Sequence, residues 1–223
     1  RAHTVLGLSG SLVREDQRLS KIYDVVGPRL FEYGTKRNHT IQIVRLPVDR
    51  NSNGRGIVEQ TIRALNPYKV RALVEILEMH AGQRVIVFSD IVRVVDILHE
   101  TVLRGRSIVL NGTTPRTQRE ESLSQFSDSV PGTMTLLCTR VCDVSVDFPI
   151  GCVVVQYHIT SGSRQQEIQR CGRGSRGSDE GFTVYHLINM DTEEERFSER
   201  RVAHISEQMW GTVNVTDTMV NHD

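Results

Sequence analysis

The strongest constraint on the fold is an alternation of short apolar segments with longer amphipathic segments, from residue 66 to about residue 209. Residues 85–88 are apolar throughout, as expected of a strand buried on both faces of a parallel sheet. Asn66 and Pro67 supply a helix cap and a first-turn proline, and apolar side chains then recur at helical spacing to about His80. Further strands are expected at residues 107–110, 133–138, 152–156 and 182–188, with helices at 90–98, 115–127, 163–175 and 191–209. We therefore predict an α/β fold in which helices cover both faces of a parallel sheet.

Length and charge limit the functions that the chain can perform. Its 223 residues are enough for one large domain, or for one complete domain with part of another. Lys and Arg number 27, and Asp and Glu also number 27, so the formal net charge is zero. Binding to nucleic acid through an overall positive charge is excluded, and only a local basic stripe remains for that purpose.

The cysteines and the apolar runs bear on the cellular compartment. Cys138, Cys142, Cys152 and Cys171 lie in or beside apolar segments and have no paired C-x-x-C spacing. We therefore expect neither a zinc site nor a disulfide framework, which fits a reducing compartment. No run of 18 apolar residues occurs and residues 1–9 lack the apolar core of a signal peptide, so we expect no membrane span and no secretion signal. The sequence begins without Met in the middle of an expected strand, which indicates a fragment.

The first 65 residues have a different character. We expect a strand at residues 4–9, a charged helix at about 14–26, and one apolar run at 41–46 within a polar segment. Residues 51–56 read Asn-Ser-Asn-Gly-Arg-Gly, which is typical of a flexible linker or a trimmed loop.

An arginine-rich segment, residues 166–176, is the most specific indication of function. Arg170, Arg173 and Arg176 recur every three residues, so on a helix that begins near Gly162 their guanidinium groups project from one side. A guanidinium remains protonated and can bond two phosphate oxygens at once, which favours a polyphosphate target and suits the charge that develops during phosphoryl transfer. A solvated basic helix, or an Arg-Gly tract that contacts RNA loosely, would contain the same residues.

A second segment, residues 139–149, follows the expected strand at 133–138. Thr139 places a hydroxyl at the strand end, where it could hold a nucleic-acid phosphate, and Asp147 could accept a hydrogen bond from a ribose hydroxyl. The carboxyl ends of parallel strands form the usual binding edge of such a sheet, so we expect these residues there. Asp147 also suits an acid in a turn before Pro149.

Together these segments resemble the second RecA-like lobe of a superfamily 2 helicase. Residues 169–176 are similar to motif VI, 139–149 to motif V and 85–90 to motif IV. A closer resemblance, to the XPB family of DNA helicases, is carried by residues 6–16, by Asn66-Pro67-x-Lys69, by Asp143-x-Ser145-x-Asp147-x-Pro149 and by Gly162-Ser163-Arg164-x-Gln166-Glu167. It covers nearly the whole chain apart from residues 36–61, and the Arg-Glu-Asp sequence directly after motif III is a feature of that family.

The resemblance implies a nucleotide-binding role for one set of residues. Arg173 and Arg176 would be catalytic arginine fingers that reach the γ-phosphate of ATP. Asp147 would lie near the ribose. The remaining residues that would bind or support the nucleotide are Arg170, Gln166 and Gln169, the glutamines linking it to motif V.

A second set would bind DNA. Ser89, Thr113 and Thr139 would hold one strand by its phosphates, a contact that does not read sequence. The residues Arg14, Glu15 and Asp16 resemble the charged element that the family uses against DNA and its own second lobe. As a bare pattern, the same three residues are equally typical of a helix start with an internal ion pair.

The resemblance also implies a division of the chain into three parts, and it reveals where the motifs depart from the family pattern. Residues 1–35 would end the first lobe with motif III, residues 36–65 would form a linker or a reduced thumb region, and residues 66–223 would form the second lobe. Motif III departs from the family pattern by reading Ser9-Gly10-Ser11, and motif V departs from it at Arg140. Motif VI has Cys171, Gly174 and Ser175 where apolar residues usually pack. A Gly-Ser pair in a helix costs on the order of 1 kcal/mol relative to good helix formers.

The sequence contains no Gly-x-x-x-x-Gly-Lys-Ser/Thr phosphate loop and no Asp-Glu-x-His segment. ATP and Mg²⁺ would therefore be held mainly by the first lobe, and this chain alone would be inactive. The activity implied by the resemblance is an ATP-dependent DNA helicase or translocase that opens DNA in transcription initiation and nucleotide excision repair.

The resemblance implies partners and a location as well. The partners would be double-stranded and single-stranded DNA, the first lobe of the same protein, and either transcription factor IIH subunits in a eukaryotic nucleus or a nuclease partner in an archaeal cytoplasm, with no membrane involved. Two alternatives use the same fold. One is a diverged, non-catalytic paralogue that acts as a scaffold in a repair or transcription complex, and the other is the motor lobe of a restriction-type system.

Overall fold

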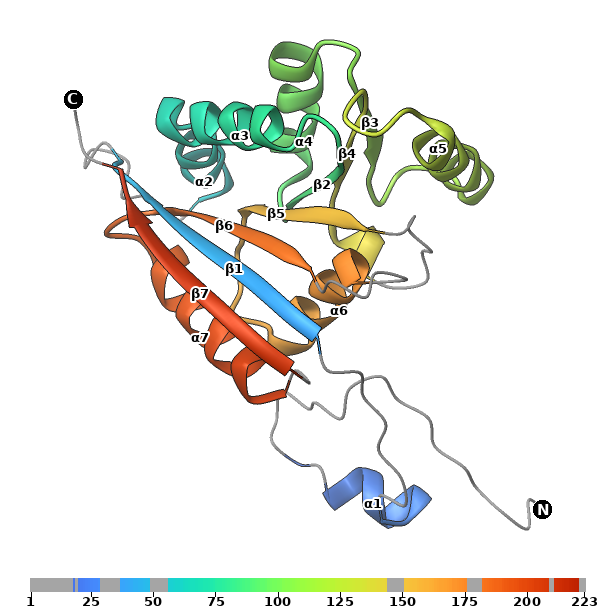
Figure 1. Ribbon diagram of the computed structural model, residues 1–223, viewed down its shortest axis with the longest axis vertical. Helices are drawn as coiled ribbons and strands as arrows, with labels where there is room; N and C mark the ends of the chain where they lie inside the picture. Colours follow the sequence, from blue (N-terminus) through green and yellow to red (C-terminus); the bar gives the residue numbers. More distant parts are fainter. Residues whose placement is uncertain are drawn as a thin grey trace.

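The computed structural model describes residues 18, 20–28, 37–48, 56–143, 151–175, 182–208 and 211–220. Within these ranges seven strands form one sheet in the order β3-β4-β2-β5-β6-β1-β7, and all neighbouring strands are parallel (Figure 1). The strands are β1 (Arg37–Leu46), β2 (Arg84–Ser89), β3 (Ser107–Leu110), β4 (Thr135–Cys138), β5 (Cys152–His158), β6 (Thr183–Asn189) and β7 (Gly211–Met219).

Helices pack against both faces of this sheet, which confirms the predicted fold class. Figure 1 shows α2, α3 and α4 grouped on one side and α6 and α7 on the other. The helices are α1 (Ser20–Val26), α2 (Ile57–Ala64), α3 (Pro67–Met79), α4 (Val92–Ile97), α5 (Arg116–Asp128), α6 (Arg164–Ser175) and α7 (Glu193–Gln208), with a π-helical turn η1 (Leu98–Leu103) and a 3₁₀ turn η2 (Arg140–Asp143).

Two apolar clusters fill the space between the sheet and its two helical layers. In β2, Ile86 and Phe88 belong to the cluster beneath α5, α6 and α7, whereas Val85 and Val87 belong to the cluster beneath α2, α3 and α4. Successive side chains of a strand point to opposite faces, so a strand covered on both faces needs an unbroken apolar run. This requirement explains why the buried strands could be recognised in the sequence.

Strand β1 lies in the segment where the sequence predicts a linker or a reduced thumb. It pairs with β6, where Thr40 faces Thr183, and with β7, where Arg37 faces Gly211. Its side chains alternate, and Ile41 and Ile43 enter the apolar cluster beneath α6 and α7. The sheet of this lobe therefore extends back to residue 37, and helix α2, which the sequence analysis did not predict, lies in the same segment.

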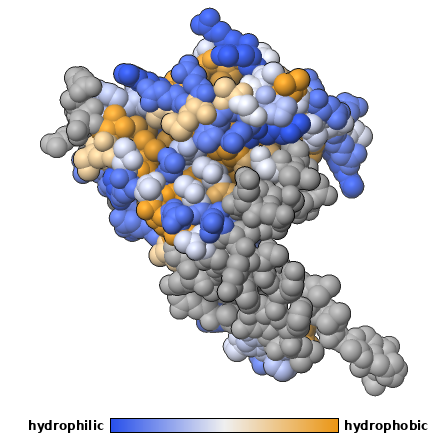
Figure 2. Space-filling model, viewed as in Figure 1, coloured by the Kyte–Doolittle hydropathy of each residue, from blue (hydrophilic) through white to orange (hydrophobic). Residues whose placement is uncertain are grey.

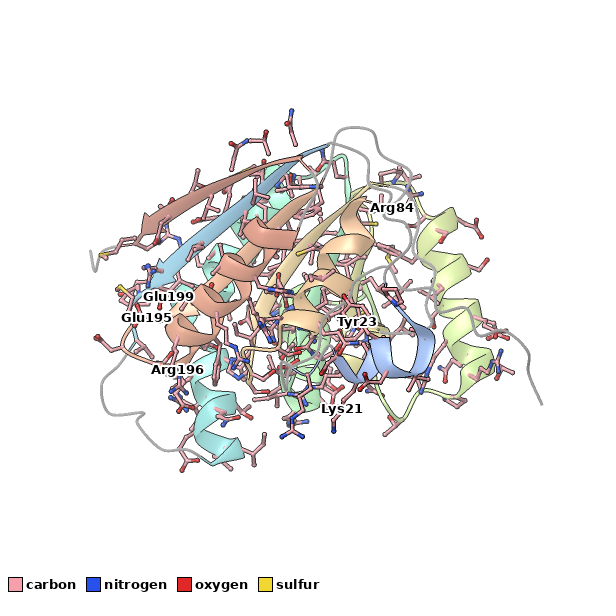
Figure 3. All side chains as sticks on the ribbon, turned by 90° about the horizontal axis from the view of Figure 1, so that it is seen from below. Lys21, Tyr23, Arg84, Glu195, Arg196 and Glu199 are labelled. Carbon is pink, nitrogen blue, oxygen red and sulfur yellow. The ribbon has the colours of Figure 1, made fainter. Side chains whose placement is uncertain are left out.

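Strand β7 forms one edge of the sheet and was also not predicted. Most of its side chains are exposed and many are Thr, Asn or Asp, so it lacks the apolar run of the central strands. It is joined to its neighbours by Arg45 of β1, whose Nε donates to Asp217 at 3.0 Å and whose Nη1 donates to Glu195 of α7 at 2.7 Å. Figure 3 shows Glu195 and Glu199 close together on α7.

The surface in the view of Figure 2 is mixed. Hydrophilic residues dominate the part formed by α3, α4 and α5, and hydrophobic residues gather toward the side of β1 and β7. None of the helices in the described ranges is both long and apolar enough to cross a membrane.

Candidate nucleotide and DNA site

The carboxyl ends of β2, β4 and β5 meet at one edge of the sheet, where helix α6 begins. Because the strands are parallel, this edge collects Ser89 and Asp90, the segment from Thr139 to Asp143, and the segment from His158 to Thr160. The side chains of these segments and of α6 form a buried hydrogen-bonded network.

Arg170 of α6 is the centre of this network and has no exposed surface. Its Nε donates to Asp143 Oδ1 at 2.6 Å, its Nη1 to Gln156 Oε1 at 2.7 Å, and its Nη2 to Asp90 Oδ1 at 2.9 Å. Its guanidinium carbon also lies 4.5 Å from the centre of the Phe88 ring. One guanidinium thus joins the regions that resemble motifs IV, V and VI.

Asp90 fixes the loop after β5 to the same network. Its Oδ2 accepts from the backbone N–H and the hydroxyl of Thr160, each at 2.9 Å, and from Arg140 at 3.4 Å. Burial alone would raise the pKa of Asp90, but the positive Arg170 and the N–H of Thr160 hold that pKa well below its usual range. Asp90 is therefore a carboxylate, and its charge is balanced by arginine.

Glu167 is a second buried centre, one turn before Arg170 on the same helix. Its carboxylate accepts from Gln156 Nε2 at 3.0 Å and from Arg201 Nη1 at 2.9 Å, and it lies 3.0 Å from His186 Nε2. Burial opposes ionisation here too, but His186 and Arg201 lower the pKa of Glu167 well below its usual range. Its other partner is Cys171, whose Sγ lies 3.2 Å from Oε1.

The predicted nucleotide-binding residues differ from one another in burial and in the residues that they contact. Gln166 donates to Asp143 Oδ2 at 2.6 Å, so it contacts the region that resembles motif V, and Gln169 is half-buried. Arg170 has no surface with which to touch a nucleotide in this conformation, so its predicted direct contact is replaced by the bonds described above. Arg173 lies within α6, but its side chain, together with Asp147 and Arg176, lies outside the described residues.

The residues predicted to bind DNA also differ in accessibility. Ser89 is fully buried, and its hydroxyl bonds to the backbone of Ile91, so it is not available to a phosphate in this conformation. Thr139 is buried at the end of β4, whereas Thr113 is exposed after β3 and donates to Asn111 Oδ1 at 2.7 Å. Arg14, Glu15 and Asp16 lie outside the described residues.

A third buried cluster explains the Asn66-Pro67-x-Lys69 passage. Asn66 caps α3 by accepting from the backbone N–H of Tyr68 at 3.1 Å, as the sequence predicts. Lys69, fully buried, donates to Glu194 of α7 at 2.7 Å, and His158 Nδ1 lies 2.5 Å from the same carboxylate. The passage therefore anchors α3 to the start of α7.

The carboxylates at this edge of the sheet do not suit a divalent cation. Asp90, Asp143 and Glu167 are each bonded to an arginine, and no group of three or more His, Cys, Asp or Glu residues in the described part of the chain could hold a metal ion. These residues therefore do not fit a resident Mg²⁺.

The sequence analysis missed several members of the network. Asp90 was noted only as the end of a motif-like segment, and His186 and Arg201 were not singled out. Arg201 is one of two adjacent arginines in a charged helix, which is typical of a solvated surface, and only its position against α6 shows that it is buried. Glu167, by contrast, belongs to a quoted passage, so the signal for it was present.

Comparison with solved structures bears on the fold alone. The C-terminal domain of the DEAD-box protein Dbp5 has a TM-score of 0.56 and 14% identity, and the match covers 82% of this chain and 91% of that one. T4 UvsW has a TM-score of 0.55 and 12% identity, covering 81% of this chain and 42% of that one. The first of these matches supports a RecA-like fold of the kind found in helicase C-terminal domains.

Comparison of sequences identifies the family. Helicase/translocase subunits of general transcription and DNA repair factor IIH are similar to this chain: XPB/SSL2 of Saccharomyces cerevisiae is 31% identical over 93% of this chain and 26% of its own length. XPB of Encephalitozoon cuniculi is 30% identical over 99% of this chain and 35% of its own length. This chain spans about a quarter to a third of the length of these relatives. Because residues 53–223 match the model of the ERCC3/RAD25/XPB C-terminal helicase, the chain belongs to that family.

Proposed function

We propose that this chain is the second motor lobe of an ATP-dependent DNA translocase of the XPB type. The observation that carries the proposal is the Arg170 network, in which one buried guanidinium binds Asp90, Asp143 and Gln156. Such a network makes three strand ends and α6 move as one body, which a lobe that transmits nucleotide state to DNA requires. The names of the relatives, which are helicase/translocase subunits, support the same activity.

In this proposal the chain supplies charge stabilisation rather than the phosphate loop. Arg173 of α6, and Arg176 after it in the sequence, would reach the γ-phosphate, where positive charge lowers the barrier to phosphoryl transfer. Asp147 would contact the ribose, and Gln166 and Gln169 would lie between the nucleotide and Asp143. Arg170 would act indirectly, by fixing the helix that carries the fingers.

Mg²⁺ and most contacts to ATP would come from a first lobe that carries the phosphate loop. The buried carboxylates described above are occupied by arginines, which agrees with a metal site outside the described residues. The DNA contacts would be made through phosphates, by Thr113 and Thr139 and by the Arg14-Glu15-Asp16 element. Assembly into transcription factor IIH in a nucleus follows by analogy with the relatives.

The arginine fingers provide the direct test. In the complete gene product, Arg173→Ala or Arg176→Ala should lower the DNA-stimulated kcat by on the order of a hundredfold, with DNA affinity nearly unchanged. Arg116→Ala is the matched control, because Arg116 is highly exposed on α5 and its ion-pair partner within the described part of the chain is the exposed Glu120, at 3.3 Å. Two finger variants with kcat within a factor of two of wild type would contradict the proposal.

The isolated 223-residue chain supplies a second test. Without a phosphate loop it should show no ATP hydrolysis above background, with or without duplex DNA. Turnover by this chain alone would refute the need for a first lobe. A complete gene product that binds its partners but never hydrolyses ATP would instead favour the non-catalytic scaffold.

A further inference from the structure

Helix α7 contacts the start of α6 through a buried side chain, Arg201. The Arg201 guanidinium has no exposed surface and bonds three acceptors on one short segment. Nε donates to the carbonyl oxygen of Ser161 at 2.8 Å, Nη1 to Glu167 Oε2 at 2.9 Å, and Nη2 to Gln166 Oε1 at 2.6 Å.

These acceptors determine both the position and the rotation of α6. Ser161 lies in the connection that leads from β5 into the helix, and Gln166 and Glu167 lie in its first turn. Fixing a backbone carbonyl and two side chains on that turn leaves the helix little freedom to slide or rotate. The same first turn continues into the Arg170 network through the bond from Gln166 to Asp143.

The far side of Arg201 is also fixed, because α7 is anchored elsewhere. Its first turn holds Lys69 of α3 through Glu194, at 2.7 Å. Its middle contacts β6, where Ser198 Oγ lies 2.8 Å from His186 Nδ1. Arg201 therefore connects α6 to a helix that is itself joined to both the sheet and α3.

We propose that Arg201 is a positioning residue for ATP hydrolysis, which holds the first turn of α6 and so sets the course of the helix that carries Arg173. The inference rests on the proposed function. Arg201 acts only through Gln166, Glu167 and Ser161 and touches neither substrate nor DNA. Because a displacement of about 1 Å at a catalytic group costs up to a hundredfold in rate, loss of this support should lower kcat more than it changes KM.

The choice of variant follows from the buried charges. Replacing Arg201 by Ala would leave the buried Glu167 without its arginine partner, and removal of one partner from a buried ion pair is strongly destabilising. Lysine keeps the charge beside Glu167 but is a single point of donation on a flexible stem. Arg201→Lys therefore removes the three-way attachment while retaining the charge balance.

The experiment compares Arg201→Lys with wild type in the complete gene product, with Arg196→Lys as the matched control. Arg196 lies on the same helix and is mostly exposed, 3.7 Å from Glu193 (Figure 3). All three proteins are assayed at a temperature at which circular dichroism shows them fully folded. In Arg201→Lys, kcat should fall about tenfold or more, while KM for ATP and DNA affinity stay within about twofold.

Hydrogen exchange supplies a readout that does not depend on turnover. Backbone amides of α6 should exchange about tenfold faster in Arg201→Lys than in wild type, whereas amides of β2 should change little. Arg196→Lys should match wild type in both measurements. A uniform rise in exchange across the molecule would mean a general loss of stability and would overturn the proposal.

The outcomes separate this inference from the proposed function. Normal kcat in Arg201→Lys, or unchanged exchange in α6, overturns the positioning role. If the wild-type protein does not hydrolyse ATP at all, the proposed function fails and the role in hydrolysis fails with it. Exchange in α6 then still decides whether Arg201 holds that helix in place.

Discussion

Glu194 illustrates how single residues of this chain carry buried charge. Burial alone would raise the pKa of its carboxyl, but the positive Lys69, together with His158 and the backbone N–H of Asn189, lowers the pKa to about 2. An unperturbed Glu carboxyl has a pKa of 4.5. A folded-state pKa below the unfolded one means that the ion pair stabilises the fold above about pH 4.5 and that this contribution is lost as the pH falls toward 2.

We therefore predict that Glu194→Gln lowers the free energy of unfolding at pH 7 by about 3 kcal/mol. The difference between variant and wild type should shrink steadily between about pH 5 and pH 2, because protonation removes the same charge from the wild type. Urea unfolding at a series of pH values measures it. Glu75→Gln is the control, since Glu75 forms an exposed pair with Arg71, at 2.9 Å. This substitution should lower the free energy of unfolding by under about 0.5 kcal/mol at every pH. A difference in the free energy of unfolding that does not vary with pH would contradict the lowered pKa of Glu194.

Individual site residues could be predicted only where their role is local or belongs to a recognisable segment. Asn66 was identified as a helix cap because the cap and its partner are two residues apart. Arg170 was identified as important, but its partner Asp90 is 80 residues away, and no periodicity connects them. Residue type alone could not show that Arg170 is buried rather than pointing at a nucleotide, because an arginine in a basic segment suits either environment.

At the scale of elements, helix α6 tolerates the small residues that depart from the family pattern. The helix continues through Gly174 and Ser175, and Cys171 is fully buried in an apolar cluster, so it packs where an apolar residue is usual. Gly172 differs from these, because a Cβ built there would meet no other atom within 4 Å. The fold itself therefore places no steric requirement on a glycine at residue 172.

We predict that Gly172→Ala raises the free energy of unfolding by about 0.5–1 kcal/mol, the usual gain when alanine replaces glycine inside a helix. Thermal or urea unfolding of the 223-residue chain provides the measurement. A loss of stability would show that the backbone needs the freedom of glycine at this position. Gain of stability with loss of turnover in the complete gene product would assign the glycine to the nucleotide instead.

The loop between α5 and β4 contains a glycine with the opposite requirement. Gly132 has a φ of 85°, and a Cβ there would lie 1.9 Å from the carbonyl oxygen of Ala81. Gly105 has a similar φ of 80°, but a Cβ there would meet nothing within 4 Å. Gly105 therefore reports the strain of the left-handed backbone alone, whereas Gly132 reports the same strain with a backbone collision added.

We predict that Gly105→Ala costs about 1 kcal/mol of stability, from the left-handed backbone alone, and that Gly132→Ala costs about 3 kcal/mol because a backbone collision adds to it. Equilibrium unfolding of both variants in urea tests the difference. Equal losses of stability would mean that the loop of Gly132 moves away from Ala81 at no cost in free energy.

At the scale of the whole molecule, neutral net charge limits how the protein can hold DNA. With 27 basic and 27 acidic residues, only a few phosphates can be neutralised at any surface. Several of the cations are moreover used internally, since Lys69, Arg170 and Arg201 are fully buried. In the proposed function, contacts with DNA would then depend mainly on neutral donors at strand ends.

We predict that DNA binding by this chain is weak and depends shallowly on salt, with release of roughly two to four counterions. Thr113→Val should weaken binding to two unrelated duplexes by the same factor, because phosphate contacts do not read sequence. Thr139→Val provides the comparison for a buried hydroxyl. A salt titration on both duplexes measures the slope, and a steep slope or a strong sequence preference would contradict this model of the binding surface.

The overall fold was predictable to the extent that its strands are buried on both faces. Five strands, β2 to β6, were found from their apolar runs, whereas β1 and β7 were not placed in the sheet. Strand β7 lies at an edge and is covered on fewer sides, so its sequence is free to be polar. The position of β1 between β6 and β7 depends on pairing with residues far along the chain, which no local pattern records.

That pairing has a consequence for how the protein is made. Thr40 of β1 pairs with Thr183, so roughly 140 residues must be synthesised before β1 meets its first neighbour, and β7 follows later still. At about 5–20 residues per second, β1 emerges from the ribosome about 7–30 s before its partners exist. Its apolar side chains, Ile41 and Ile43, have no sheet to join during that interval. The nascent chain therefore exposes an extended apolar segment of the kind that chaperones bind, and a stop codon before residue 183 would leave β1 without its β6 and β7 partners in the sheet.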